Sequence, residues 1–230
     1  MPRPPLTRTR IVAAGVSVAH ELGLPAVDLR SVARRVNTTA TGLRRHIGTT
    51  ELIDAVVAEI VTHMPAVPSR GDHLRRLRTW TSETRDWLTE YPGLATYLLA
   101  NRWDVPGALD RLEDLARVLQ EVELPPGEAA PAAISVFWFV LSGADLHTSP
   151  RIIGLIDEAP VLAQPGDEVR WPLLGGTVGD YSQATTAAQF DFGLELLLEA
   201  IGTRARPESA TPPRSAVGRP RSSRHGARVG

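Results

Sequence analysis

Residues 29–47, LRSVARRVNTTATGLRRHI, decide the fold expected for this chain. Apolar side chains recur at helical spacing on both sides of Asn37, which predicts two short helices that bury a common apolar face. Asn tolerates the left-handed backbone of a tight turn, and Thr38 or Thr39 can cap the second helix. The apolar residues are Val32, Ala33 and Val36 before the turn and Ala40, Leu43 and Ile47 after it.

The second of these helices presents small polar residues and arginines on its outer face. Once its apolar side is buried, the residues left outside are Thr41, Gly42, Arg44 and Arg45. A helix with such an outer face suits phosphates and base edges in the major groove of duplex DNA. The stretch therefore predicts a helix-turn-helix that binds double-stranded DNA.

Charge is segregated along the chain in a way that agrees with this prediction. Residues 1–50 hold eight Arg against two acids, residues 51–203 ten Arg against 23 acids, and residues 204–230 seven Arg against one acid. A basic head is attracted to phosphates and an acidic body is repelled from them, which would orient the protein on DNA. Merely solvated charged faces are the alternative, and the segregation by segment argues against it.

Composition excludes several classes of protein. The 230 residues, 43% of them hydrophobic, can bury one sizeable core and a small one. The absence of Cys excludes disulfides, thiolate zinc sites and cysteine nucleophiles. The N-terminus lacks the apolar run of a signal peptide, and the longest uncharged segment, 129–144, contains a Pro and is too short to span a membrane. We expect a cytoplasmic protein.

The rest of the chain also has helical periodicity, so we predict an all-α fold. An N-terminal three-helix DNA-binding domain is expected over 1–50, and a linker helix over 50–63 has apolar residues on two adjoining faces, which lets it touch two cores. A helical domain follows over 64–203, with a long Pro- and Gly-rich loop within 149–181. The Arg-, Pro- and Ser-rich segment 204–230 predicts a disordered basic tail.

The last predicted helix is apolar around most of its circumference. Asp191, Glu195 and Glu199 share one narrow stripe, and the apolar residues are Phe190, Phe192, Leu194, Leu196, Leu197, Leu198 and Ile201. Two opposed apolar stripes imply a partner, most simply the same helix of a second subunit, although burial within one chain is the alternative. We predict a homodimer with all of these apolar residues except Leu196 in its interface.

Two parts of the chain resemble the tetracycline-repressor family of bacterial transcription regulators. The first 60 or so residues carry one resemblance, through Thr7-Arg8, Ile11, Ala14, Leu22-Gly23, Leu29-Arg30, Val32-Ala33, Leu43, His46 and Leu52. The segment 190–197, FDFGLELL, is similar to the last helix of the tetracycline-repressor subclass itself. The resemblance implies a homodimeric repressor of a near-palindromic operator, released by a small-molecule effector that the helical domain binds.

The resemblance also implies which residues contact DNA. They are Arg30, Thr39, Ala40, Thr41, Gly42, Arg44, Arg45 and His46. Arg30 matches a base-reading Arg of the tetracycline repressor, and Thr41 and Arg45 on the exposed face are predicted to read bases with it. Gly42 and Arg44 are predicted to meet phosphates. This chain departs from the family pattern in having Asn37 for the usual Gly, Gly42 for Thr and Arg44 for Tyr, and a guanidinium contact is stronger and more salt-dependent than a phenol contact.

For the effector, the resemblance implies an apolar pocket with a few polar anchors. Candidates on core-facing stripes are Trp80, Trp87, Trp103, Phe137, Trp138 and His147, and core packing is the alternative role of each. Tyr97 stands where the tetracycline repressor has a metal-holding His, so chelation of a metal–tetracycline complex is not expected.

Motifs of enzymes are absent from the sequence. No phosphate-cradling Gly-rich loop, no G-x-S-x-G and no H-E-x-x-H occurs. We therefore expect no enzymatic activity, no cofactor and no metal site. Two alternatives stay open, namely a DNA-binding regulator without an effector and, less favoured, a helical small-molecule enzyme.

Overall fold

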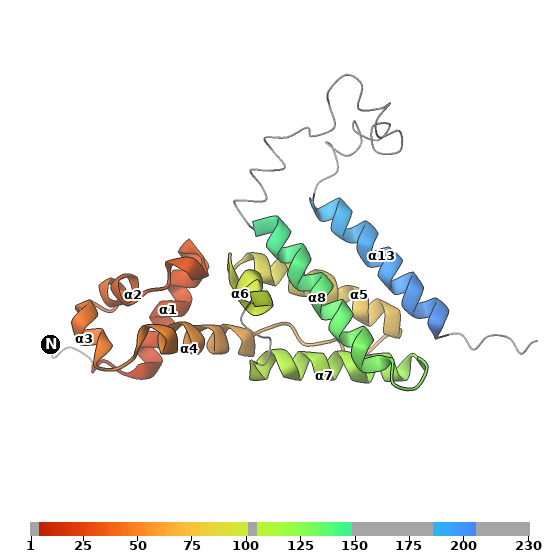
Figure 1. The fold of residues 1–230 in the computed structure, drawn as a ribbon, viewed down its shortest axis with the longest axis horizontal. Helices are drawn as coiled ribbons and strands as arrows, with labels where there is room; N and C mark the ends of the chain where they lie inside the picture. Colours follow the sequence, from red (N-terminus) through yellow and green to blue (C-terminus); the bar gives the residue numbers. More distant parts are fainter. Residues whose placement is uncertain (1–4, 101–104, 149–185, 206–230) are drawn as a thin grey trace, which may run out of the picture.

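Figure 1 shows the computed structural model of the chain, which describes residues 5–100, 105–148 and 186–205. All secondary structure in these residues is helical, which confirms the predicted all-α fold. The elements are α1 (Arg8–Leu22), η1 (Leu24–Ala26), α2 (Leu29–Arg35), α3 (Ala40–Arg44), α4 (Thr49–Thr62), α5 (His73–Thr89), α6 (Leu94–Ala100), α7 (Pro106–Glu121), α8 (Ala129–Thr148) and α13 (Thr186–Arg204).

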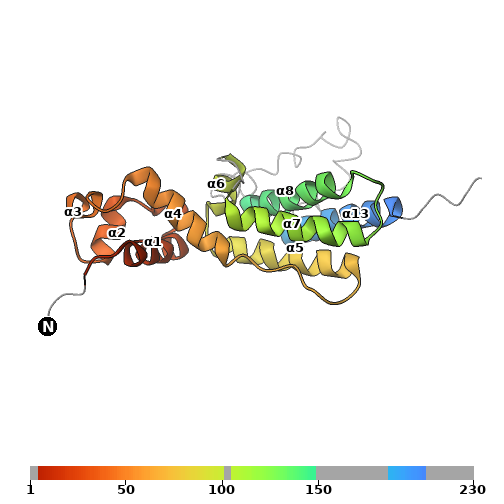
Figure 2. The ribbon, with the colours of Figure 1, turned by 90° about the horizontal axis from the view of Figure 1, so that it is seen from below.

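The described residues form an elongated molecule with a small and a large end. Helices α1 to α3 make the head, residues 5–48, and helices α5 to α13 make the body at the opposite end (Figures 1 and 2). Helix α4 runs from the head toward the body, as expected of the linker helix. The domain limits themselves stay a prediction.

Side-chain caps fix where the helices of the head and body begin. The Thr7 hydroxyl accepts from the Arg10 N–H at the start of α1, at 3.3 Å. Asp72 accepts from the N–H groups of Leu74 and Arg75 at the start of α5, at 3.0 and 3.2 Å. Each cap satisfies amides that have no partner within the first turn of a helix.

The head has a small core shared by its helices and α4. Its fully buried members include Ile11, Val32, Leu43 and Leu52. Helices α1 and α4 approach closely at Gly15, where an added Cβ would lie 2.3 Å from Val56 Cγ2. Only glycine allows this approach, so α4 is packed directly on the head before it reaches the body.

The body buries large rings and joins its outer helices by ion pairs. Trp80 on α5 is fully buried and stacks on Phe137 of α8, with ring centroids 6.3 Å apart. The acidic stripe predicted on the last helix faces arginines of α5, since Glu195 pairs with Arg78 through two contacts, one of them at 2.7 Å. These contacts fix α13 along α5.

Helix α8 is the central helix of the body. Among the described helices it is the one long and apolar enough, by length and composition, to cross a membrane. It is longer than the uncharged segment of the sequence because it continues through Asp145 to Thr148. It contacts α5, α6, α7 and α13 and buries one face, including Val136, Phe137 and Val140, against the body.

Candidate functional site

The turn between α2 and α3 has the left-handed residue that the sequence predicted. Asn37 has φ +56°, and the N–H of Thr38 donates to the carbonyl of Ala33 at 2.8 Å. The Asn37 N–H donates to the Arg34 carbonyl at 3.2 Å. These bonds cap the C-terminal end of α2. The turn therefore sets the orientation of α3 relative to α2.

A threonine cap starts α3 at a defined residue. Of the two threonines predicted as caps, Thr39 does so, because its Oγ1 accepts from the Gly42 N–H at 3.0 Å. An added Cβ on Gly42 would lie 3.1 Å from Thr38 Oγ1 and 3.2 Å from Thr39 Oγ1. A larger residue at 42 would press on the cap, which gives a physical reason for Gly here.

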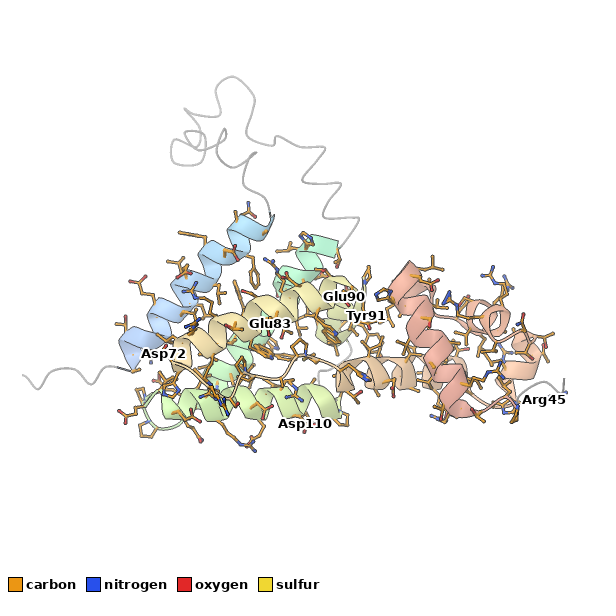
Figure 3. All side chains as sticks on the ribbon, turned by 180° about the vertical axis from the view of Figure 1, so that it is seen from behind. Arg45, Asp72, Glu83, Glu90, Tyr91 and Asp110 are labelled. Carbon is orange, nitrogen blue, oxygen red and sulfur yellow. The ribbon has the colours of Figure 1, made fainter. Side chains whose placement is uncertain are left out.

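Most of the predicted DNA-contacting residues belong to α3 or adjoin it, at the outer end of the head, whereas Arg30 lies in the first turn of α2. Leu43 and Ile47 are buried, as predicted, so the opposite side of α3 faces solvent. The residues Arg30, Thr39, Thr41, Arg44, Arg45 and His46 are exposed, and Ala40 and Gly42 are partly buried. Figure 3 shows Arg45 at the end of the head remote from the body.

Ion pairs engage two of the arginines of the head and leave four others without an ion pair among the described residues. Arg8 pairs with Glu51, and Arg35 makes two contacts with Glu21, one of them at 2.8 Å. The exposed residues Arg30, Arg34, Arg44 and Arg45 have no ion-pair partner within the described part of the chain. These four guanidiniums, on α2, α3 and the residue after α3, make this part of the head cationic, which suits a polyanion such as DNA.

Glu51 occupies the start of α4 beside this cationic end. Its carboxylate accepts from the Gly48 N–H at 3.3 Å and also from Arg8. The Arg8 guanidinium, followed by the Gly48 amide, holds the Glu51 pKa below its ordinary value. Glu51 is therefore ionised at neutral pH and keeps Arg8 on the side of α4.

Of the six predicted effector residues, the five that the structure describes are not brought together around one cavity. Trp80 and Phe137 pack on each other in the core, and the Trp80 Nε1–H donates to the Pro65 carbonyl at 2.9 Å. Trp87 is partly buried, while Trp138 and His147 are exposed on α8. Trp103 lies outside the described residues. The helical spacing of Trp138 and His147 predicted that they face the core. They lie instead on the face of α8 that is turned away from the core.

A groove of about 420 Å3 lies between α7 and α8. Its lining consists of Leu109, Asp110, Leu112, Glu113, Ala116, Ala130, Ala133 and Ile134, none of which was a predicted effector residue. In the described residues, no cluster of three His, Asp or Glu has the arrangement of a metal site.

Two buried threonines of α5 were missed by the sequence analysis. Thr81 is fully buried, and its hydroxyl donates to the Leu77 carbonyl at 2.7 Å. Thr84 is 1% exposed, and its hydroxyl has no hydrogen-bond partner among the described residues. The sequence contained a signal for their burial, since Thr81 and Thr84 fall on one helical stripe with Leu77 and Leu88. An unpaired hydroxyl in an apolar core is costly, which makes Thr84 a candidate ligand contact.

Helix α13 turns one of its two apolar stripes toward the body of its own chain. Phe190, Leu194, Leu198 and Ile201 are at most 5% exposed and pack in the body's core, while Leu197 is partly buried. Phe192 and Leu196 are exposed. Helical periodicity could not distinguish the two stripes because both are apolar. The exposed side of α13 therefore contains Phe192, which was predicted to lie in a dimer interface, and Leu196, which was not.

Comparison with known proteins identifies relatives of the whole chain. A family model described as the tetracyclin repressor-like C-terminal domain matches residues 64–205. The HTH-type transcriptional repressor DrrR1 of Streptomyces coeruleorubidus is 26% identical over 228 residues, an alignment that covers 91% of this chain and 83% of DrrR1. These similar proteins are transcription regulators rather than enzymes.

Solved structures have the same fold. ActR of Streptomyces coelicolor in complex with (S)-DNPA has a TM-score of 0.72 at 22% identity, covering 88% of this chain and all of ActR. ActR with actinorhodin has a TM-score of 0.69 at 22% identity, over 86% and 96% of the two chains. BioQ with its double-stranded DNA operator has a TM-score of 0.62 at 19% identity, over 86% and 99%. At identities this low, the structural similarity establishes the fold alone.

Proposed function

Because the chain belongs to the tetracycline-repressor family of transcriptional regulators, we propose that it is a homodimeric repressor released from a near-palindromic DNA operator by a small-molecule effector. It would act in the cytoplasm, where the operator is accessible. The observation that carries the DNA-binding part is the group of exposed, unpaired arginines around α3, namely Arg30, Arg34, Arg44 and Arg45.

In this proposal α3 enters the major groove with its exposed side toward the base edges. Arg45 and Thr41 lie on that side of α3, and Arg30 lies in the first turn of α2. A guanidinium can bond a guanine through two donors at once, whereas contacts to phosphates carry no sequence information. We assign base reading to Arg30, Thr41 and Arg45, and phosphate contact to Arg44.

The homodimer is supported by large exposed apolar residues on two contacting helices, α8 and α13. They are Trp138 and Leu146 on α8, 49% and 46% exposed, and Phe192 and Leu196 on α13, 67% and 52% exposed. Isolated apolar side chains are common on surfaces, but four large ones on two contacting helices indicate an interface. A two-fold axis through an interface of these two helices would present two heads to one duplex.

The effector part of the proposal is supported by the ActR complexes and by Thr84. ActR was solved with (S)-DNPA and with actinorhodin, so these compounds are suitable first probes. The unpaired, buried Thr84 hydroxyl offers one polar contact to a ligand that enters the body's core. The second candidate, a regulator without an effector, is favoured by the close Trp80–Phe137 packing that fills the middle of the body.

Selection from random duplexes followed by fluorescence anisotropy tests the proposal. We expect enrichment of an inverted repeat whose affinity falls steeply with salt. Actinorhodin or (S)-DNPA should then lower the affinity for that duplex. Absence of any enriched sequence would contradict operator binding. Tight binding that no aromatic probe weakens would favour the regulator without an effector.

A further inference from the structure

The groove between α7 and α8 combines an apolar floor with acidic side chains. Leu112 and Ala133 are at most 8% exposed, while Leu109, which also lines the groove, is 42% exposed. Asp110 and Glu113 complete the α7 side of the groove. Side chains three residues apart on a helix are neighbours on one face. The groove therefore presents apolar surface beside two neighbouring carboxylates.

Both carboxylates are accessible to a cation. Asp110 is exposed, and its side chain has no ion pair within the described residues (Figure 3). Glu113 pairs with Arg117 at 3.2 Å, and both of these side chains are 63% exposed. Pairs as exposed as this one are weak, so Arg117 does not prevent Glu113 from binding another guanidinium.

The end of α13 brings the start of segment 206–230 to this groove. Arg204 donates to both carboxylate oxygens of Glu128, at 2.8 and 2.6 Å. Glu128 directly precedes α8, whose first turns contribute Ala130 and Ile134 to the groove. A helix rises by about 1.5 Å per residue, so Ile134 lies about 9 Å along α8 from Glu128. Ten extended residues span about 33 Å, so the segment is long enough to reach the whole groove.

The composition of segment 206–230, which lies outside the described residues, fits the groove. The segment carries six Arg against one acid, whereas residues 51–203 carry ten Arg against 23 acids. An Arg side chain has an apolar stem that covers apolar surface and a guanidinium that binds carboxylates. Because the segment is attached beside the groove, its effective concentration there is on the order of millimolar. Weak individual ion pairs are therefore sufficient to hold it.

We propose that the groove between α7 and α8 binds the arginine-rich segment 206–230 of the same chain. Guanidiniums of the segment pair with Asp110 and Glu113, and their stems cover Leu109. A second copy of the chain is a poorer occupant, because its body is acidic as well. The segment has six Arg for two groove carboxylates, so part of it stays available to other polyanions. The docking does not depend on the proposed function, so its test needs neither DNA nor effector.

Paramagnetic broadening of methyl signals measures how close the segment lies to the groove. The chain has no Cys, so Ser215→Cys gives a single attachment site for a nitroxide within the segment. The methyl groups of Leu109, Leu112 and Ile134 report on the groove, and those of the fully buried Leu77 report that the body is folded. We expect the groove signals to be weaker with the oxidised nitroxide than with the reduced one.

Asp110→Asn combined with Glu113→Gln tests the two carboxylates. This double variant nearly keeps the shape of the groove and removes two charges, so the groove signals should recover most of their intensity. Glu83→Gln combined with Glu90→Gln is the matched control. Both glutamates are exposed, have no ion pair within the described residues and lie on α5 or at its end, outside the groove (Figure 3). The control removes the same charge from the body, so its broadening should match that of the unsubstituted groove.

Equal groove signals with the oxidised and the reduced nitroxide would overturn the proposal. Equal broadening with and without the two groove carboxylates would also overturn it, because attachment beside Arg204 would then explain the proximity. Recovery of the signals in the control as well would show attraction to the acidic body in general, which contradicts binding by the groove. If the groove variant does not fold, salt decides. At about 1 M salt the screening length is about 3 Å, so the broadening should be relieved, and broadening that persists contradicts the ion pairs.

Discussion

Asp28 and Ser31 cap the first turn of α2 reciprocally. The Ser31 N–H donates to Asp28 Oδ1 at 2.6 Å, and the Asp28 N–H donates to Ser31 Oγ at 3.1 Å. The bond from the Ser31 amide is the main reason that the Asp28 pKa lies below its ordinary value of 3.8. The cap holds the helix that carries Arg30.

Removal of this cap should destabilise the protein in a pH-dependent way. Asp28→Ala should lower the free energy of unfolding at pH 7 by about 1 kcal/mol. Because the pKa is lowered in the folded state, the ionised cap stabilises the fold above pH 3.8 and loses this effect as pH falls through the folded pKa. Urea unfolding between pH 7 and pH 2.5 measures the difference from wild type.

Asp28→Asn is the control, because its amide oxygen still caps but does not titrate. The free energy of unfolding of Asp28→Asn should lie slightly below that of the wild type at pH 7, and this difference should diminish further toward pH 2.5. A loss of stability relative to the wild type that grows as the pH falls would contradict the role given to the Asp28 carboxylate.

Thr84 and Thr81 form a matched pair one turn apart on α5. Thr84→Val removes a buried hydroxyl without a partner, so it should raise the free energy of unfolding by about 1 kcal/mol. Thr81→Val removes a satisfied hydroxyl, so it should leave stability unchanged or lower it by up to about 1 kcal/mol. Urea titrations of both variants compare them directly. Destabilisation by Thr84→Val would show that its hydroxyl is bonded in solution.

At the scale of elements, the exposed stripe of α13 determines the oligomeric state that we expect. Phe192→Glu places a charge in the proposed interface and should convert the dimer into a folded monomer. Leu22→Glu is the control, since Leu22 is 68% exposed on α1 and away from this face. Sedimentation velocity measures both. A dimer that tolerates Phe192→Glu at micromolar concentration would contradict the interface.

The helix-turn-helix was predictable from the sequence because its signals are local. Asn37, Thr39 and the buried Leu43 each follow from the chemistry of a turn, a cap or a single apolar stripe. The orientation of α13 was not predictable, since the sides bearing Phe190 and Phe192 are both apolar. Nor was the exposure of Trp138, which depends on which face of α8 the neighbouring helices cover.

The effector region was the least predictable part for a similar reason. A pocket is a gap between several helices, so its lining depends on long-range packing rather than on the pattern within one helix. Trp80 fits a core-facing stripe whether it lines a cavity or fills one. The structure shows it packed on Phe137. The groove between α7 and α8 is lined by other residues.

At the scale of the whole molecule, the basic segment 206–230 is expected to act only through charge. It lies outside the described residues and carries six Arg against one acid. We predict that it adds sequence-independent attraction to DNA, with about 0.9 of log–log salt slope for each Arg that meets a phosphate. Its deletion should reduce the slope for operator and random duplexes alike. An inert tail is the alternative, and it predicts an unchanged slope.

The deletion should begin at residue 206, not earlier. Arg204 bonds both oxygens of Glu128, at 2.8 and 2.6 Å, which ties the end of α13 to the residue before α8. A longer deletion would remove this ion pair at the end of α13, the helix that carries the proposed dimer interface. Recognition of the operator should survive the deletion from residue 206, because the residues assigned to it all lie in the head.

The most direct test of the central claim is the DNA affinity of Arg44→Ala and Arg45→Ala on the selected operator and a scrambled duplex, measured across a salt series. Arg45→Ala should cost about 1 to 3 kcal/mol on the operator and relax specificity at one position, while Arg44→Ala should weaken both duplexes equally and reduce the slope by about 0.9. Arg117→Ala, on the body, should change neither the affinity for either duplex nor its dependence on salt. An altered sequence preference with an unchanged slope in Arg44→Ala would contradict the assignment of α3 to DNA.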